Sequence, residues 1–150
     1  YDFSLLKGVI EVNDLQLERT VAKVLAALEG VDEPRVAQWG LAFKAGTDDV
    51  RESPAVKIVD ALMARGIEVT AFDPAVKVSP SPGLTVSGDP IDAAKEADVL
   101  VIATEWPQFG ALDLRAVRDA MRGSAIVDAR NLLDPLTVQQ LGMSYSGVGR

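Results

Sequence analysis

The 150-residue sequence contains no cysteine and no histidine. The missing cysteines exclude a disulfide scaffold and a thiolate nucleophile within this chain. Without histidine there is also no Cys/His zinc site and no histidine-dependent triad. Long apolar runs are missing too: none approaches the ~18 residues that cross a membrane, and no signal peptide is visible. We therefore predict no metal site, no membrane partner and a cytoplasmic location.

Basic residues are few. Lys and Arg number 15 against 22 Asp and Glu, which gives a net charge of -7. A general nucleic-acid binder shows a basic face, so we predict no nucleic-acid partner. A small phosphorylated ligand remains compatible, because it needs only a few local cations. Apolar residues make up 48% of the sequence, enough for one folded domain with a real core. The sequence begins at Tyr1 rather than Met, and we expect a fragment of a longer protein.

Helical and strand patterns alternate along the chain. We predict helices at 2–30, 54–65, 89–97, 114–121 and 135–141. We predict strands at 35–40, 67–72, 84–86, 98–103, 125–127 and 143–148, with a surface loop at 75–83. This alternation indicates βαβ units with right-handed crossovers. The predicted fold class is α/β: a Rossmann-like parallel sheet with helices on both faces, preceded by a long N-terminal helix. The dinucleotide fingerprint GxGxxG does not follow the first strand.

The N-terminal helix has an apolar side at helical spacing, formed by Leu17, Val21, Val24, Leu25 and Leu28. Asn13-Asp14 interrupts the pattern, so the sequence allows either one helix or two pieces. The apolar side is compatible with two roles. It packs on another subunit or a missing domain, or it belongs to the core of this domain.

Three loops are expected to leave the carboxyl ends of neighbouring strands, where open α/β sheets bind ligands. They carry Phe43, Lys44 and Arg51; Thr104, Glu105 and Trp106; and Arg130 with Asn131. Lysine offers phosphate a point charge and arginine a planar fork. Ser53-Pro54, as N-cap and first helical residue, adds the positive end of a helix dipole. These residue types predict a site for a diphosphate-bearing ligand.

Structural roles compete with binding at each of these positions. Arg51 has Asp48, Asp49 and Glu52 as nearby partners, and Arg130 has Asp128 and Asp134. Lys44 is compatible with a solvated loop lysine, and Trp106 with a packing residue. The pair Asp48-Asp49 lacks a second ligand group in view, so we assign it no metal. Glu105 is a weak candidate for an acid or base, and we assign no catalytic residue.

The sequence GLAFKAGTDDVRESP at 40–54 closely resembles the C-terminal domain signature of the UDP-glucose/GDP-mannose dehydrogenase family. Other stretches extend the resemblance over essentially the whole chain: AFDP at 71–74, TEW at 104–106 followed by Phe109, and VDARNLLD at 127–134. VND at 12–14 and the helix after it resemble the end of that family's central dimerisation domain. The first motif is specific.

The resemblance implies an oxidoreductase that converts the C6 alcohol of a nucleotide sugar to a carboxylate, in two hydride transfers to NAD. It implies that Phe43, Lys44 and Arg130 contact a UDP-sugar and that Arg51 reaches toward NAD bound on another domain. The family's NAD-binding domain and catalytic cysteine segment are absent from the sequence. We therefore expect NAD to be bound mainly by the missing N-terminal domain and expect the fragment alone to be inactive.

The resemblance also implies a domain organisation. Residues 1–30 would end the central dimerisation region, and residues 31–150 would form the nucleotide-sugar-binding C-terminal domain. The implied partners are the missing NAD-binding domain of the same chain and a second subunit, in a homodimer through the N-terminal helix. TEW at 104–106 favours the UDP-glucose branch, whose product is UDP-glucuronate. The alternatives are a domain of a GDP-mannose or other nucleotide-sugar dehydrogenase, and a non-catalytic nucleotide-binding module.

Overall fold

The computed structural model describes residues 4–150, with the side chains of Leu5 and of 13–150. The helices are α1 (Ser4–Ala27), α2 (Pro54–Met63), α3 (Pro90–Ala94), α4 (Pro107–Gly110), α5 (Leu114–Ala120) and α6 (Pro135–Gln140). The strands are β1 (Arg35–Trp39), β2 (Glu68–Phe72), β3 (Thr85–Val86), β4 (Val99–Ile102), β5 (Ala125–Asp128) and β6 (Ser144–Ser146). The predicted order of strands and helices after the first helix is confirmed, with α4 as an additional short helix, and β2 and β3 follow one another across the loop at 75–83.

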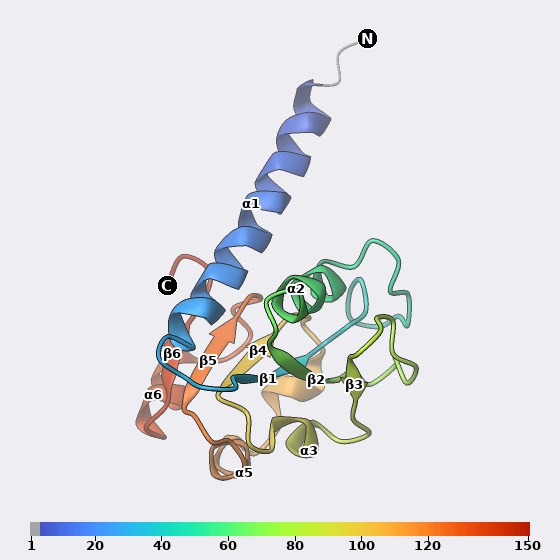
Figure 1. Cartoon of the computed structure of the whole chain (residues 1–150). Coiled ribbons are helices and arrows are strands. Elements are labelled where there is room, and N and C mark those ends of the chain that lie inside the picture. Colours follow the sequence, from blue (N-terminus) through green and yellow to red (C-terminus); the bar gives the residue numbers. More distant parts are fainter. Residues whose placement is uncertain (1–3) are drawn as a thin grey trace.

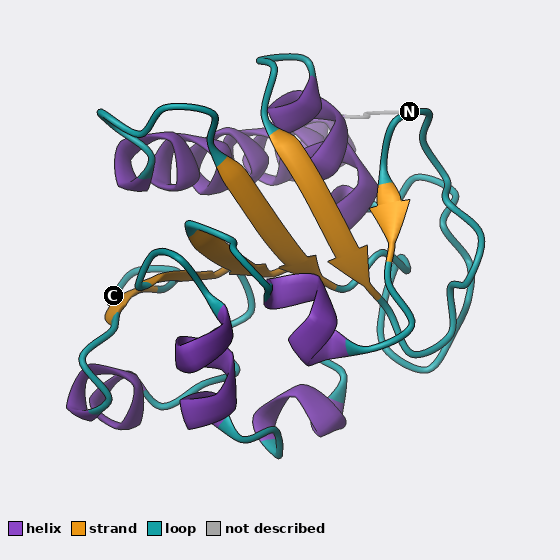
Figure 2. Cartoon of the chain, turned by 60° about the horizontal axis from the view of Figure 1, so that its bottom comes forward, coloured by secondary structure: helices purple, strands orange, loops and turns teal. Residues whose placement is uncertain are grey.

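All paired strands run parallel, in the order β3-β2-β1-β4-β5-β6. This is the doubly wound order of a Rossmann fold. The first three strands are added toward one side of the sheet and the last three toward the other, so the switch point lies between the neighbouring strands β1 and β4. Helices cover both faces of the sheet, as Figure 2 shows. The predicted fold class is therefore confirmed, and the carboxyl ends of β1, β4 and β5 meet at one edge.

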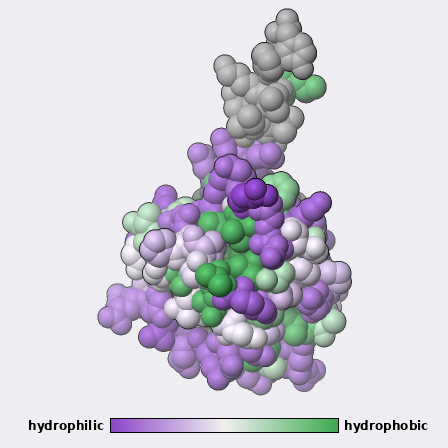
Figure 3. Space-filling model, turned by 90° about the vertical axis from the view of Figure 1, so that its right-hand side faces the viewer, coloured by the Kyte–Doolittle hydropathy of each residue, from purple (hydrophilic) through white to green (hydrophobic). Residues whose placement is uncertain are grey.

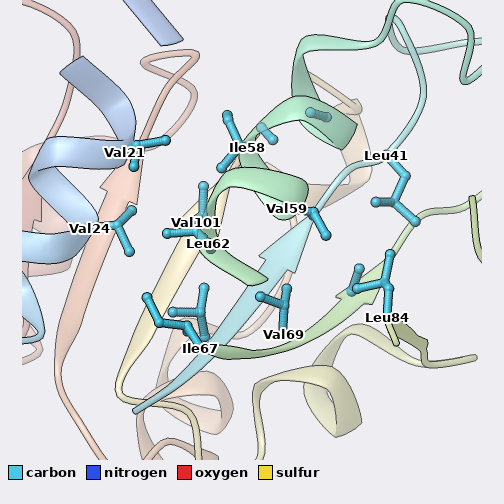
Figure 4. Close-up of a cluster of buried hydrophobic side chains, with 14 of the residues drawn as sticks. Val21, Val24, Leu41, Ile58, Val59, Leu62, Ile67, Val69, Leu84 and Val101 are labelled. Carbon is cyan, nitrogen blue, oxygen red and sulfur yellow. The ribbon is translucent and has the colours of Figure 1, made fainter. Parts of the chain in front are cut away.

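The first face of the sheet is covered by α1 and α2. Figure 4 shows apolar side chains from both helices meeting those of the strands, among them Val24 of α1, Leu62 of α2 and Val101 of β4. All three are fully buried. Strands buried on both faces carry continuous apolar runs, which is why β4 reads Val-Leu-Val-Ile.

The second face of the sheet has an aromatic centre. The Trp39 and Phe109 ring centroids lie 5.4 Å apart, and Phe72 meets Phe109 edge-on at 6.2 Å. The indole Nε1 of Trp39 donates to the Pro90 carbonyl at 3.0 Å, so this buried polar atom is satisfied. Phe109 comes from α4, a four-residue turn that the periodicity did not predict because it is too short to show a period.

Helix α1 is continuous through Asn13-Asp14, so the division into two pieces allowed by the sequence does not occur. Its C-terminal half lies across the sheet and α2, and the rest extends beyond the domain in Figure 1. Val21, Val24 and Leu28 are buried in the core, whereas Leu15 is 44% exposed. The C-terminal half is thus a core helix of this domain. The predicted start at residue 2 lies outside the described residues.

Figure 3 shows one face, with an apolar centre bordered by hydrophilic residues. Among the described residues, no helix is long and apolar enough to cross a membrane.

Candidate functional site

The first loop of the site begins at Gly40, directly after β1. Its φ of +106° is in the region that favours glycine, and a Cβ there would lie 2.2 Å from Thr104 Oγ1. Its N–H donates to the Phe72 carbonyl at 2.7 Å. Only glycine lets the chain leave the sheet here at this distance from the loop after β4. Two of the predicted loops are therefore in direct contact at their first residues.

Phe43 and Lys44 lie at the outer part of this loop. The Phe43 N–H donates to the Asp49 carbonyl at 2.7 Å and closes the turn. Ser53 is the predicted N-cap of α2: its hydroxyl donates to the Leu41 carbonyl at 2.7 Å and accepts from Val56 N–H at 3.4 Å. Both ends of the loop are thus fixed, while the Phe43 ring is 46% exposed and Lys44 is exposed.

Arg130 lies in the loop after β5. Its Nε donates to the Ala103 carbonyl at 3.3 Å and lies 4.0 Å from Glu105 Oε2. Its backbone N–H donates to Asp128 Oδ1 at 3.1 Å. The ion pairs with Asp128 or Asp134 considered from the sequence are not formed by the Arg130 side chain. A 4.0 Å contact with a half-exposed glutamate is weak, so the guanidinium remains able to bind an anion.

One cavity of about 300 Å³ brings the three residues predicted to bind substrate together, since Phe43, Lys44 and Arg130 all line it. The rest of its lining comes from α1, α2 and two small residues of the neighbouring loops: Asn13, Gln16, Leu17, Thr20, Pro54, Ile58, Ala103 and Ala129. Among the residues whose side chains are described, the lining contains two cations and no acid. An apolar floor, one aromatic ring, two amides and two cations provide complementary groups for a nucleotide and its phosphates.

Arg51 is not among the residues that line this cavity. Its Nε and Nη2 each lie 3.0 Å from an oxygen of the Asp49 carboxylate. The Arg51 hydrogen bonds lower the pKa of Asp49 to about 2, and the same contact raises the pKa of Arg51. The arginine side chain is 88% exposed. The structural partner considered from the sequence is therefore present, and the role toward NAD stays a prediction.

The TEW motif at 104–106 contributes mainly packing. Thr104 is fully buried against Gly40, and Trp106 packs against the aromatic core of the second face. Thr104 Oγ1 and Trp106 Nε1 have no hydrogen-bond partner among the described residues. Among the side chains that the structure describes, those of Leu5 and of 13–150, no group of three acidic residues is placed to hold a metal ion, and this includes the surroundings of Asp48-Asp49.

The sequence did not single out the α1 wall of the cavity. Gln16 and Leu17 are half-buried there, and Thr20 is buried with its hydroxyl donating to the Gln16 carbonyl at 3.0 Å. The helical pattern predicted an apolar side, but not that its edge would face the Lys44 loop. That depends on how α1 docks against α2 and the sheet, for which the sequence carries no local signal.

The comparison with protein families decides the identity of this domain. Residues 37–135 match the UDP binding domain of the UDP-glucose/GDP-mannose dehydrogenase family. The chain belongs to this family. A UDP-glucose 6-dehydrogenase of Pseudomonas aeruginosa is 38% identical over 160 aligned residues, covering 100% of this chain and 35% of the relative. The chain thus spans about a third of the length of such family members.

Solved structures of the family are similar over most of this chain. A UDP-D-ManNAc dehydrogenase from Pyrococcus horikoshii has a TM-score of 0.82 and 29% identity, covering 100% of this chain and 34% of that one. A UDP-glucose dehydrogenase from Pyrobaculum islandicum has a TM-score of 0.74 and 30% identity, covering 95% of this chain and 31% of that one. The motif-based resemblance to the family is confirmed.

Proposed function

We propose that this chain is the UDP-sugar-binding part of an NAD-dependent UDP-glucose 6-dehydrogenase. The cavity shared by Phe43, Lys44 and Arg130 carries the proposal. Lys44 and Arg130 supply the positive charge that a diphosphate requires, and Phe43 supplies a face for a base or a sugar. The match to a UDP binding domain and the similarity to UDP-glucose 6-dehydrogenases support this ligand class.

The chemistry of oxidation lies outside this chain. It contains no cysteine for covalent capture of an aldehyde and no histidine for proton transfer. In a doubly wound fold, a dinucleotide is cradled by backbone amides after the first strand. Here the amides of Leu41 and Ala42 bind the carboxylate of Asp73 at 2.7 and 3.0 Å, so this position does not fit NAD. NAD, bound by the missing domain, would accept the hydride. This chain would bind and orient the UDP-sugar.

Three further assignments belong to the proposal. Arg51 reaches toward NAD from its exposed loop. Its guanidinium does not line the cavity and is 88% exposed, so it is accessible to a ligand bound on another domain. Residues 1–30 end the central region, with the C-terminal half of α1 packed into the core of the domain that follows, and the part of α1 beyond the domain contributes to a homodimer. Residues 31–150 form the C-terminal domain. A cytoplasmic location follows from the proposed use of UDP-glucose and NAD.

The experiment is isothermal titration of the chain with UDP-glucose, UDP-glucuronate and GDP-mannose. We expect both UDP-sugars to bind more tightly than GDP-mannose. Lys44→Ala should weaken UDP-glucose binding about tenfold to a hundredfold, because a charge-assisted hydrogen bond is lost at an exposed position. Lys95→Ala, which removes another exposed lysine, should bind like the wild type. Equal binding by the wild type and Lys44→Ala would contradict the assignment of the site.

A second candidate substrate has specific support. The UDP-D-ManNAc dehydrogenase of P. horikoshii is more similar to this chain in fold than the UDP-glucose dehydrogenase of P. islandicum is, with TM-scores of 0.82 and 0.74. The same titration with UDP-N-acetylmannosamine separates the two candidates. Tighter binding of the acetamido sugar would transfer the proposal to that substrate, and weaker binding would favour UDP-glucose.

A further inference from the structure

Lys44 and Arg130, the two cations of the cavity, each lie on a loop whose backbone is hydrogen-bonded to a buried carboxylate. The first carboxylate is Asp73, which follows β2 and is fully buried. Its Oδ2 accepts from the N–H groups of Leu41 and Ala42 at 2.7 and 3.0 Å, immediately before Phe43. Its Oδ1 accepts from two amides of the following turn at 2.8 and 3.2 Å. One carboxylate thus joins the loop after β1 to the loop after β2.

The second carboxylate is Asp128, the last residue of β5, which is also fully buried. Its Oδ1 accepts from the Arg130 N–H at 3.1 Å. Its Oδ2 accepts from the Leu133 N–H and the Tyr145 hydroxyl, each at 2.9 Å. The turn in between contains Asn131 at a φ of +51°, a left-handed conformation that asparagine adopts more readily than most other non-glycine residues. Asp128 therefore holds this turn at Arg130 and at Leu133, on either side of Asn131.

The charge of these carboxylates matters to the loops. A buried carboxylate is retained when several N–H donors satisfy it, and those donors in turn depend on its oxygens. Replacing it with asparagine substitutes an NH2 group for one acceptor oxygen, so an amide that it held would face another donor. For Asp73, an NH2 group at the Oδ2 position releases the residues before Phe43 and Lys44. For Asp128 it releases Arg130 or the amide at the other side of its turn.

Asp73 and Asp128 are not among the residues that line the cavity. Any influence on a ligand passes through the loops they hold. A diphosphate needs its two cations at a fixed spacing, and a displacement of about 1 Å is enough to lose much of the benefit of positioning. We propose that Asp73 and Asp128 are positioning residues that set the spacing of Lys44 and Arg130. This inference rests on the proposed function of the cavity.

Asp98 provides a matched control at the opposite edge of the sheet. It precedes β4, is 8% exposed, and its Oδ2 accepts from the Arg35 N–H at 2.9 Å. Both carboxylate oxygens bind the Arg122 guanidinium, at 2.8 and 2.7 Å. Asp98→Asn therefore disturbs a buried, hydrogen-bonded carboxylate while leaving the two cation loops in place.

The first readout needs no ligand. Amide hydrogen exchange is compared in the wild type and in Asp73→Asn, Asp128→Asn and Asp98→Asn, at a temperature where all are folded. We expect at least tenfold faster exchange at 41–44 in the first variant and at 130–133 in the second. Asp98→Asn should leave both segments unchanged. Equal protection of the two loops in all four proteins would overturn the inference, whether or not the cavity binds a UDP-sugar.

The second readout is UDP-glucose affinity by titration of the same proteins. We expect Asp73→Asn and Asp128→Asn to bind at least tenfold more weakly, and Asp98→Asn to bind within twofold of the wild type. The same loss in all three variants would assign the effect to general stability and overturn the inference. If Asp128→Asn does not fold, Tyr145→Phe removes one donor from the carboxylate and retains its charge. It should bind two- to fivefold more weakly, and unchanged binding would count against the role of Asp128.

Failure of the proposed function has a separate signature. In that case the wild type binds no UDP-sugar, while the exchange experiment still shows whether each aspartate holds its loop. Faster loop exchange without a change in UDP-glucose affinity would show that Asp73 and Asp128 stabilise the loops, but it would overturn their role in positioning the cations.

Discussion

Arg51 and Asp49 face each other in a two-point ion pair, with Nε and Nη2 each 3.0 Å from a carboxylate oxygen. The pair lies on an exposed loop, and the Arg51 hydrogen bonds lower the pKa of Asp49 to about 2, so the carboxylate stays ionised in mild acid as well as at neutral pH. A planar guanidinium held by one carboxylate keeps its remaining N–H donors for another anion. The pair therefore holds an exposed Arg51 that does not line the cavity of its own domain.

Arg51→Ala is expected to act on NAD rather than on the UDP-sugar. In the full-length enzyme the KM for NAD should rise several-fold, while the Kd for UDP-glucose should stay within twofold. Arg65→Ala, which removes an exposed arginine from the end of α2, should change neither value. Steady-state kinetics with varied NAD makes the test. An unchanged KM for NAD would reduce Arg51 to a surface ion pair.

Arg130→Lys tests the guanidinium fork as opposed to charge alone. Lysine keeps the positive charge but loses the planar set of donors, including the bond to the Ala103 carbonyl. UDP-glucose should bind about tenfold more weakly, with little change in melting temperature. Arg118→Lys is the matched control, because that arginine is also partly buried and bonded to a carbonyl, that of Leu141 at 3.2 Å. Equal effects of the two substitutions on affinity would contradict a specific role for Arg130.

Gly40→Ala should destabilise the fold strongly. The new Cβ would lie 2.2 Å from Thr104 Oγ1 at a φ of +106°. Together, strain and overlap should cost about 2–4 kcal/mol in the free energy of unfolding. Gly46→Ala has a similar φ of +86° but open space around it, so it should cost only about 1 kcal/mol. Urea unfolding of both variants measures the difference. Similar decreases in unfolding free energy would show that the Thr104 side chain moves aside at little cost.

Stability should fall in acid partly through Asp98. The Arg122 hydrogen bond is the largest cause that lowers the pKa of this carboxyl, ahead of the opposing effect of burial. A lowered folded-state pKa contributes stability above the unfolded pKa of about 3.9 and loses it as pH falls through the folded value. Urea unfolding between pH 6 and pH 2.5 should therefore show a steeper decline below about pH 4 for the wild type than for Asp98→Asn. Parallel profiles would contradict this contribution.

Much of the fold was predictable from local pattern. The run Val99–Ile102 is apolar at every position because both faces of the sheet are covered, and Ser53-Pro54 begins α2 as a cap and first-turn pair should. The single turn at Pro107–Gly110 has no period to detect. The continuity of α1 through Asn13-Asp14 also escaped prediction. Two polar residues interrupt an apolar pattern without breaking the backbone hydrogen bonds of a helix.

The candidate site was predictable in part. Strand ends of a parallel sheet converge, so the loops of Lys44 and Arg130 were expected to meet, and they line one cavity. The sequence did not show which of three nearby acids would pair with Arg51, because the pairing depends on the exact conformation of the loop. Gln16 was not anticipated at all, since its place in the cavity follows from the docking of a distant helix.

The most direct test of the account is amide chemical-shift mapping of the chain during titration with UDP-glucose. We predict that the largest shifts fall on Phe43, Lys44 and Arg130, with further shifts at Gln16 on the α1 wall. The amides around Asp98, at the opposite edge of the sheet, should not move. Saturable shifts confined to the cavity would establish it as the nucleotide-sugar site. Shifts centred on any other surface would contradict that assignment.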